Sequence, residues 1–425
     1  MAIVRSHGQT NVGRKRKHNE DNFLIDSDLK LYIVADGMGG HNAGEVASEY
    51  TIKIIRREIF KNKDIILNTI KAEKEGNTGE PEEAIRLVEH AIQTACYEVY
   101  HMAQVNEARK GMGTTVVVLL IVGDRAIVAH VGDSRVYLVR KNRLHQITED
   151  HSMVQEQLRQ GKITKEEAEH SPYKNVITRA IGIYEYVPPD IIYLELAKDD
   201  RFMLCSDGVY PYFTENELLQ VLTLKKPLDQ ITDIMVNKVL NGGAHDNLTV
   251  IIAEVVSINT RTSQMEISNK LDILKKIPLF QYLGYKELVK TYSIISTKKY
   301  NAGDIIIQEG DIGQEFFILF KGKVAVLKGD IEVAQLNPGS NFGEMGLVDN
   351  APRSATIKAL ETCYLMVIER SKFFELMKKE PKISVKLLWS FLKVFSARLR
   401  ATTNELSEVK NSKKEKEENL NLFDD

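Results

Sequence analysis

The stretch Leu31–Glu45, LYIVADGMGGHNAGE, determines how the first half of the chain is interpreted. Its apolar residues Leu31–Ala35 are β-prone and end abruptly at Asp36, which predicts a short buried strand. The glycines that follow let the backbone turn tightly and let a carbonyl approach a ligand. A carboxylate beside an accessible carbonyl suits a hard divalent cation, because such ions prefer oxygen ligands. Taken alone, the pattern is more typical of a structural turn, and the missing Gly-Lys-Ser/Thr excludes a nucleotide-binding P-loop.

Length and composition limit the possible classes of protein. The 425 residues are enough for two or three domains, and the formal net charge of −2 gives no bulk attraction to nucleic acid or acidic membranes. Three widely spaced cysteines suggest neither a disulfide framework nor a zinc site. The first residues lack the pattern of a signal peptide, and no apolar run reaches about 18 residues. These features predict a soluble cytoplasmic protein without nucleic-acid or membrane partners.

A charged run, Gly13–Asn22 (GRKRKHNEDN), precedes a second predicted strand. It is either a solvated surface segment or an anion-binding arginine beside metal-binding acids. Helical apolar spacing follows in Glu45–Phe60 and Glu82–Met102, and Gly113–Thr148 has the turn signals of a β-meander. Asp150–Arg179 is polar and interrupted, which predicts a helix with a surface flap.

Three strand boundaries each present an aspartate: Asp36, Asp207 and Asp246. A single aspartate at a turn is ordinary. Three of them, with Glu20 and Asp21 in addition, would converge at one end of a sheet sandwich. Two metals about 3.5–4 Å apart and bridged by a carboxylate activate water for displacement at phosphorus.

Eight ordered motifs carry a family resemblance: RKHNED at 16–21, then VADGMGG, GMGTTV, VGDSR, TEDHS, TRAIG, SDG and GGAHDN. Together they resemble the metal-dependent serine/threonine protein phosphatase family, type 2C, of the bacterial type, over roughly residues 3 to 255. The resemblance implies an α-β-β-α sandwich with a site for Mn²⁺ or Mg²⁺ at one end. It also implies hydrolysis of phosphoserine and phosphothreonine in proteins.

The resemblance also implies which residues bind the metals. Asp36 would bridge both ions, and Gly37 would offer its carbonyl to one of them. Asp207 and Asp246 would hold the other ion, while Glu20–Asp21 would bind directly or through water. All of these ligands supply oxygen, as hard cations require.

Further roles follow from the same resemblance. Arg16 would hold the substrate phosphate as a bidentate donor. Asp133 and Asp207 match positions where bacterial relatives bind a third, weaker ion. Some family members have a histidine after Asp-Gly as a proposed general acid, but this chain has Met38. A thioether cannot donate that proton, so the acid is undetermined, and metal-bound water is favoured.

The second half has a different character. Ser257–Asn269 is polar and without periodicity, which predicts a linker. Amphipathic helix follows, and from Lys298 onward short strands alternate with glycines, which predicts a small barrel. In Asn341–Ala359 (NFGEMGLVDNAPRSATIKA), a carboxylate and a guanidinium flank an apolar turn. These two residues fit either a surface ion pair or a cyclic-phosphate site.

Residues from about 270 to 400 resemble a cyclic-nucleotide-binding domain, because FGE-x-G-L…PRSA-T matches the phosphate-binding cassette of that family. The resemblance implies that Arg353 pairs with the phosphate, Glu344 accepts from a ribose hydroxyl, and backbone donors near Gly343, Ser354 and Ala355 assist. Members selective for cGMP often have threonine after the cassette arginine, where this chain has serine, which leaves the choice of base ambiguous.

The last helix carries apolar residues at steps of three and four, which predicts a heptad seam and a homodimer. The alternative is a single helix that packs on its own barrel. SARLRATTNEL resembles the dimer helix of the catabolite activator protein, with Thr402 and Thr403 where that protein approaches adenine, which favours cAMP over cGMP. No DNA-binding motif follows. The seam residues are Val385, Leu388, Leu392, Phe395, Leu399, Thr402, Leu406 and Val409.

The sequence therefore predicts a phosphoprotein phosphatase with two or three Mn²⁺ or Mg²⁺ ions, regulated by a cyclic nucleotide. The alternative is a catalytically silent sensor that docks phosphoproteins. The complete set of acids favours the enzyme. The predicted boundaries are 1–256 for the phosphatase domain, 257–269 for the linker, 270–382 for the β-roll, 383–410 for the dimer helix and 411–425 for a disordered charged tail.

Overall fold

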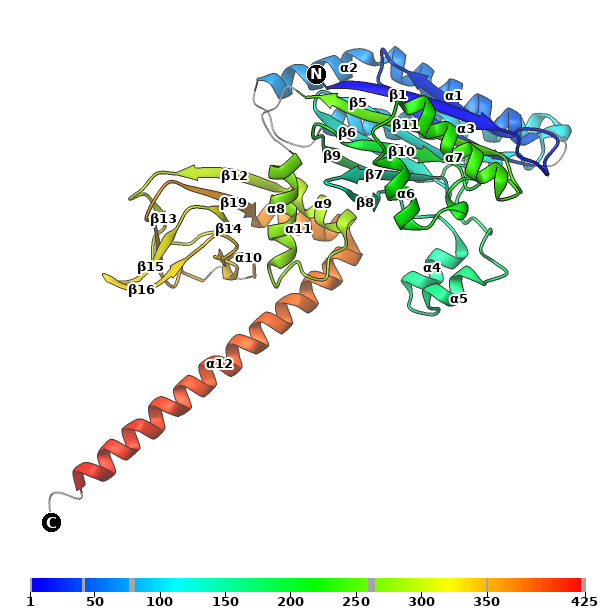
Figure 1. Ribbon diagram of the computed structural model, residues 1–425. Coiled ribbons are helices and arrows are strands. Elements are labelled where there is room, and N and C mark those ends of the chain that lie inside the picture. The colour runs from blue at the N-terminus through cyan, green and yellow to red at the C-terminus, as the bar shows by residue number, and fades with distance from the viewer. Residues whose placement is uncertain (1, 40–42, 76–80, 259–263, 349–350, 422–425) are drawn as a thin grey trace. The chain divides into compact units, whose positions relative to one another are not determined.

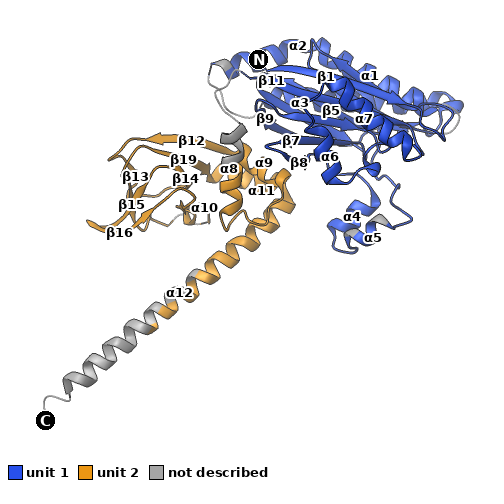
Figure 2. Cartoon of the chain, viewed as in Figure 1, with its two compact units in different colours: residues 1–267 blue, residues 268–425 orange. Residues whose placement is uncertain are grey.

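The computed structural model describes residues 2–39, 43–75, 81–258, 264–348 and 351–421. The chain divides into two compact units, residues 1–267 and 268–425 (Figure 2). Each unit has its own buried core. Within the described ranges, no helix combines the length and the apolar character needed to cross a membrane.

Two antiparallel sheets form the centre of the first unit (Figure 1). Their strand orders are β1-β11-β10-β7-β8 and β2-β3-β5-β6-β9, and β4 pairs with β3. The strands are β1 Ile3–Asn11, β2 Asp21–Asp26, β3 Leu31–Met38, β4 Gly113–Thr114, β5 Val116–Val122, β6 Arg125–Val131, β7 Arg135–Arg140, β8 Arg143–Gln146, β9 Asp190–Glu195, β10 Arg201–Cys205 and β11 Leu248–Ser257.

Helices cover the outer face of each sheet. The helices α1 (Ala43–Lys61), α2 (Lys63–Lys74) and α3 (Glu82–Val105) share a core with the β2–β9 sheet. On the other side, α6 (Glu215–Leu222) and α7 (Leu228–Asn241) pack on the β1–β8 sheet. This arrangement confirms the predicted α-β-β-α sandwich.

Strand β3 shows how the sequence produces these layers. Leu31, Ile33 and Ala35 lie in the core beneath α1 and α3, and the intervening Tyr32 and Val34 are buried on the opposite face. A strand that is buried on both faces has no polar alternation, as its sequence indicates. Strand β3 does not end at Asp36. It extends to Met38 because Gly37 and Met38 pair with β4.

The predicted flap contains two short helices, α4 (Met153–Arg159) and α5 (Lys165–Glu169). Both begin at hydroxyl caps, because Ser152 accepts from the Gln155 N–H and Thr164 accepts from the Glu167 N–H. The chain returns beside its own start, where Ser152 pairs with Ile177. The two ends of the flap therefore lie side by side where the flap joins the sandwich.

The second unit is a β-roll of two four-stranded antiparallel sheets, ordered β12-β19-β14-β17 and β13-β18-β15-β16. Its core contains Phe317, which stacks on Phe342 at 5.3 Å between ring centroids. The strands are β12 Ile295–Tyr300, β13 Ile305–Ile307, β14 Glu315–Lys321, β15 Val324–Lys328, β16 Ile331–Leu336, β17 Asn341–Phe342, β18 Thr356–Ala359 and β19 Cys363–Glu369. The predicted barrel of short strands is confirmed.

The helices of the second unit include one that is longer than predicted. They are α8 Gln264–Lys276, α9 Tyr285–Ser293, α10 Met345–Val348, α11 Arg370–Lys379 and α12 Pro381–Asn421. Helix α12 continues to Asn421, whereas the sequence predicted its end at residue 410. Helix α8 also begins inside the predicted linker.

Candidate active site

Strand pairing brings the first two predicted acids together. Asp21 on β2 pairs directly with Asp36 on β3. Asp21 is buried, and its Oδ2 accepts a hydrogen bond of 2.7 Å from the Ser206 hydroxyl. Its other oxygen, Oδ1, is buried without a hydrogen-bond partner among the described residues. A buried carboxylate oxygen left in this way is costly unless a cation faces it.

The second sheet supplies the remaining acids. Asp207 follows β10 and Asp246 precedes β11, and these two strands are antiparallel neighbours. The charge of Asp207 contributes to the raised pKa of Asp36, so the two carboxyl groups lie close together. Asp246 forms an exposed ion pair of 2.8 Å with Arg16. Acids from both sheets therefore meet at one end of the sandwich, as predicted.

Burial and mutual repulsion raise the pKa values of Asp21, Asp36 and Asp133. Burial, and then the charges of Asp207 and Asp246, raise the pKa of Asp21 to about 7. For Asp36, burial and then the charge of Asp21 raise the pKa well above its usual range. Burial and the charge of Asp207 raise the pKa of Asp133 to about 7. Carboxylates crowded in this way are stabilised by divalent cations.

The backbone around the two Asp-Gly turns leaves no room for side chains. A Cβ on Gly37 would lie 2.2 Å from the Gly44 carbonyl oxygen and 2.6 Å from that of Glu20. A Cβ on Gly208 would lie 1.8 Å from the Asn247 carbonyl oxygen. The unpartnered Asp21 oxygen, the oxygen-only donors and these close turns together fit divalent cations.

Several supporting residues were not predicted. The Asn247 side chain accepts from the Glu20 N–H at 2.8 Å and donates to the carbonyls of Val12 and His18, so it ties the charged loop to the Asp246 turn. Ser206 holds Asp21, as described above. Both residues stand beside a predicted aspartate, which is the sequence feature that points to them. Met38 lies at the end of β3, whereas His41 lies outside the described residues.

A second polar group, His130, His151 and Asp190, also has the composition of a metal site. The Arg179 guanidinium lies 3.1 Å from Asp190 Oδ1 and 3.3 Å from His151 Nε2. The His130 ring bonds the Glu149 carbonyl at 2.8 Å. Because the arginine already supplies positive charge to this group, we do not assign a cation to it.

The predicted cassette lies in the second unit. Arg353 donates to the carbonyl oxygens of Gly343 at 3.1 Å and Glu315 at 2.7 Å. Burial lowers the pKa of Arg353. A Cβ on Gly313 would lie 2.4 Å from its Nε, so glycine makes room for the guanidinium. The Ser354 carbonyl accepts from Lys328, and Ala355 lies in the turn before β18.

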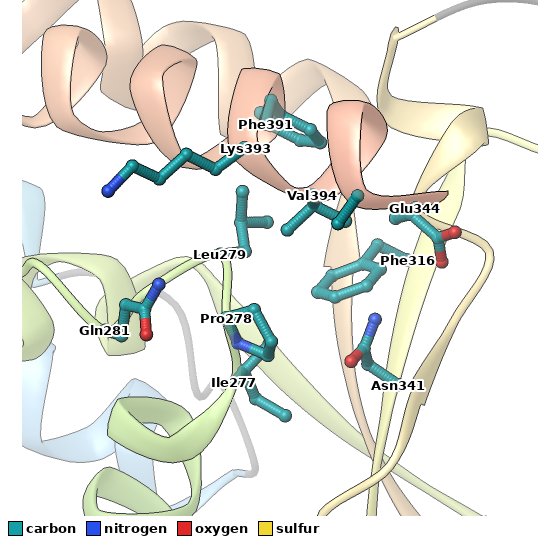
Figure 3. A pocket seen from close by; sticks show the side chains of 11 residues that line it. Ile277, Pro278, Leu279, Gln281, Phe316, Asn341, Glu344, Phe391, Lys393 and Val394 are labelled. Atoms are coloured by element: carbon teal, nitrogen blue, oxygen red, sulfur yellow. The ribbon is translucent and has the colours of Figure 1, made fainter. Parts of the chain in front are cut away.

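Glu344 is buried and lines a pocket of about 370 Å³ within the second unit (Figure 3). The pocket lies between residues 277–281, Phe316 of β14, and Phe391 and Val394 of α12. The Thr403 hydroxyl bonds the Leu399 carbonyl of its own helix at 2.8 Å, and the Thr402 side chain lies outside the described part of the chain. The predicted contact of these threonines with a base therefore remains a prediction.

Comparison of the sequence with known protein families and curated proteins agrees with a phosphatase site in the first unit. The protein phosphatase 2C family profile matches residues 13–248, and that of the cyclic nucleotide-binding domain matches residues 297–380. The serine/threonine phosphatase stp of Listeria monocytogenes is 36% identical over 58% of this chain and 94% of its own length. Protein phosphatase PhpP of Streptococcus pneumoniae is 35% identical over 60% of this chain and 98% of its own.

Solved structures give the same result. The catalytic domain of the serine/threonine protein phosphatase PstP, in complex with two manganese ions, is similar with a TM-score of 0.51 and 30% identity over 60% of this chain and all of that one. The structure of the S. agalactiae serine/threonine phosphatase is similar with a TM-score of 0.51 and 33% identity. The match covers 60% of this chain and 100% of that one. The site and fold define a metal-dependent phosphatase. The chain belongs to the protein phosphatase 2C family and also carries a cyclic nucleotide-binding domain, so the prediction of a protein serine/threonine phosphatase is confirmed at the level of the family.

Proposed function

We propose that the first unit hydrolyses phosphoserine and phosphothreonine in proteins with two Mn²⁺ or Mg²⁺ ions and binds a third ion more weakly. The convergence of carboxylates from both sheets at one end of the sandwich carries this proposal. Asp36, the Gly37 carbonyl, Asp207, Asp246 and Glu20–Asp21 would supply the oxygen ligands that hold these ions. When bound, the ions would polarise the phosphate and lower the pKa of water.

Arg16 orients the substrate in this proposal. Its guanidinium is half-exposed and forms a surface ion pair with Asp246, an interaction of low net value. A substrate phosphate, which carries more charge and accepts two parallel bonds, would compete well for it. Asp133, together with Asp207, would hold the third ion.

Hydrolysis of a generic aryl phosphate by the full-length chain tests the proposal. We expect activity with added Mn²⁺ or Mg²⁺ and none with a chelator. Absence of activity under all metal conditions, with binding of phosphoproteins retained, would instead support the silent docking sensor.

Arg16→Ala is expected to raise KM for a phosphoprotein, with a smaller effect on kcat. The loss of a charged hydrogen-bond donor costs about 1.5–3 kcal/mol, or roughly 10–150-fold in KM. Steady-state kinetics with a phosphopeptide measures this effect. The exposed Arg14 of the same loop gives a matched control, since Arg14→Ala should leave KM unchanged. An unchanged KM in Arg16→Ala would indicate that Arg16 belongs to a solvated surface segment and does not bind the substrate phosphate.

We further propose that the second unit binds a cyclic nucleotide, with cAMP favoured over cGMP, and that this binding regulates the phosphatase. The half-buried guanidinium of Arg353 and the buried carboxylate of Glu344 support an anionic ligand that carries hydroxyl groups. Titration calorimetry with both nucleotides tests the choice of base. At least tenfold tighter binding of cGMP would overturn the preference for cAMP.

Arg353→Ala is expected to remove most of the affinity for either nucleotide. Truncation of one partner of a buried charge pair costs about 2–5 kcal/mol. Calorimetry on the full chain measures the loss. Lys372, an exposed cation of the same unit, provides the control Lys372→Ala, which should bind as the unaltered chain does. Equal affinities of Arg353→Ala and the control would show that the nucleotide lies elsewhere.

We also propose a homodimer through α12. Four seam residues (Val385, Leu388, Leu392 and Leu399) are each more than half exposed in the single chain. By contrast, Phe391 is buried and packs on Phe373 and Phe395. One face of the helix therefore packs on its own unit, and the other supports contact with a second copy.

A further inference from the structure

The turn that carries Asp133 is held from both sides by two consecutive residues of another segment. Gly132, before Asp133, exchanges two hydrogen bonds with His151: the His151 N–H donates to the Gly132 carbonyl at 2.9 Å, and the Gly132 N–H donates to His151 Nδ1 at 3.2 Å. Arg135, after Asp133, donates to both oxygens of Asp150, at 2.9 Å and 2.7 Å. Residues 132–135 are called the Asp133 turn below.

The Asp133 turn has little freedom to rearrange, so these contacts fix its position. Gly132 has a positive φ of 104°, and a Cβ there would lie 2.6 Å from the Thr115 side chain. The Arg135 guanidinium also stacks 3.6 Å above the Tyr210 ring. Bidentate, stacked arginines are geometrically specific, because both the plane and the direction of the guanidinium are set by its partners.

His151 also closes the base of the flap, residues 152–178. The Thr178 N–H donates to the His151 carbonyl at 2.7 Å, and the Met153 N–H donates to the Val176 carbonyl at 2.9 Å. The two ends of the flap thus meet at His151. The same residue bonds the Asp133 turn through its other backbone group and its ring, so it is a junction between the flap and that turn.

The chemistry of the ring defines its role. A backbone N–H only donates, so His151 Nδ1 is the acceptor of the Gly132 bond, while Nε2 faces the Arg179 guanidinium at 3.3 Å. Nε2 lies 3.5 Å from Asp190 Oδ1. The ring stacks on His130 at 4.6 Å between centroids. His151 is thus held by its neighbours in the orientation that the Gly132 contact requires.

We propose that Asp150 and His151 are positioning residues that fix the Asp133 carboxylate for a third divalent cation and tie its placement to the flap. This inference rests on the proposed cation site. Displacement of the flap would pull on the His151 carbonyl and, through the ring, on Gly132. The affinity for the third cation would then depend on the position of the flap, and the flap would in turn be ordered by the cation.

Manganese binding to the full-length chain, counted by electron paramagnetic resonance and by calorimetry, tests the proposal without an activity assay. His151→Leu should weaken the weakest binding event by more than about tenfold, as loss of a supporting partner does at metal sites. The tighter events should be unchanged. His151→Asn should bind as the unaltered chain does, because its amide oxygen lies near the place of Nδ1 and can accept from Gly132.

A second variant acts through the other contact. Asp150→Asn keeps the shape of the side chain but removes the charge that pairs with Arg135, and it should also weaken only the weakest event. Hydrogen exchange of residues 152–178 gives an independent measurement. Saturating Mn²⁺ should slow exchange in the flap of the unaltered chain and of His151→Asn but not in that of His151→Leu.

Asp133→Asn separates the two ways in which the inference could fail. If Asp133→Asn still shows the weakest Mn²⁺ binding event, Asp133 does not bind a third cation. The positioning role of Asp150 and His151 is then overturned as well. If Asp133→Asn loses the weak event while His151→Leu and Asp150→Asn retain it at full affinity, only the positioning role is overturned. Loss of the tight events in Asp150→Asn, with the fold retained in a thermal melt, would also overturn it, because the contact would then serve the whole site.

Discussion

Asp207→Asn and Asp246→Asn are each expected to lower turnover by more than about 100-fold, which exceeds the usual cost of changing an outer partner of a metal site. Both aspartates lie where β10 and β11 bring the second sheet to the shared end of the sandwich. An amide lacks the charge of a carboxylate, so the cations would be bound weakly and out of place. Turnover of an aryl phosphate at saturating Mn²⁺ measures the effect.

The stability of the metal-free protein provides the control. Asp207→Asn removes one of several carboxylates that raise each other's pKa values, so its melting temperature without metal should not fall. The exposed Asp28 gives a matched substitution, Asp28→Asn, which should alter neither property. Retention of full turnover by both ligand variants would contradict the two-metal site. Loss of turnover together with a large fall in melting temperature would indicate a packing role instead.

The acids could be predicted from the sequence because each stands at a strand boundary. Asp36, Asp207 and Asp246 follow or precede short apolar runs, and strand ends from two stacked sheets meet at a shared edge. Their order along the chain also matched a known set of motifs. What the sequence could not provide was distance: the pairing of Asp21 with Asp36 is fixed by the register of β2 and β3.

The supporting contacts could not be predicted because they join residues far apart in the chain. Asn247 bonds the backbone of Glu20, 227 residues earlier, and nothing in the local pattern of either residue indicates the other. The contact of Asp150 with Arg135 likewise depends on how the flap base lies against β7. Tertiary contacts of this kind follow from the packed fold and not from local propensity.

Helix α12 shows a different limit. Its apolar spacing predicted the seam, but the same spacing also fits a helix that packs on its own barrel. In the structure Phe391 is turned to its own unit, whereas Leu392 and Leu399 are exposed, so contact with a second copy stays a proposal. The sequence predicted the end of the helix at residue 410, because the charged segment that follows is low in apolar residues, whereas the helix is drawn to Asn421.

The second large effect is expected in the response to cAMP. We expect cAMP to raise phosphatase activity, with a coupling of roughly 1–3 kcal/mol in binding terms, or about 5–150-fold. The pocket beside Glu344 is lined by Phe391 and Val394 of α12, so a ligand that moves the cassette would also move this helix. Because the proposed dimer seam lies on the opposite face of α12, such movement would change the orientation of the two protomers in the proposed dimer.

Replacing Leu392 and Leu399 with glutamate should abolish the response to cAMP while metal-dependent basal activity stays intact. Both side chains are exposed in the single chain, at 64% and 70%, so the fold of one protomer does not depend on them. Paired glutamates would face each other across the seam and separate the helices. The ratio of activity with and without cAMP, together with the mass in solution, measures both effects.

The exposed Arg400 on the same helix provides a matched control, because it directly follows Leu399 but is not a seam residue. If cAMP acts through the dimer, Arg400→Glu should keep both the dimer and the response, since it places a negative charge on α12 outside the seam. By linkage, anything that favours the active arrangement must also tighten cAMP binding, so the double glutamate variant should bind cAMP with altered affinity. A protein that is monomeric at all concentrations and still responds to cAMP would contradict this mechanism, and the coupling would then have to run within one chain.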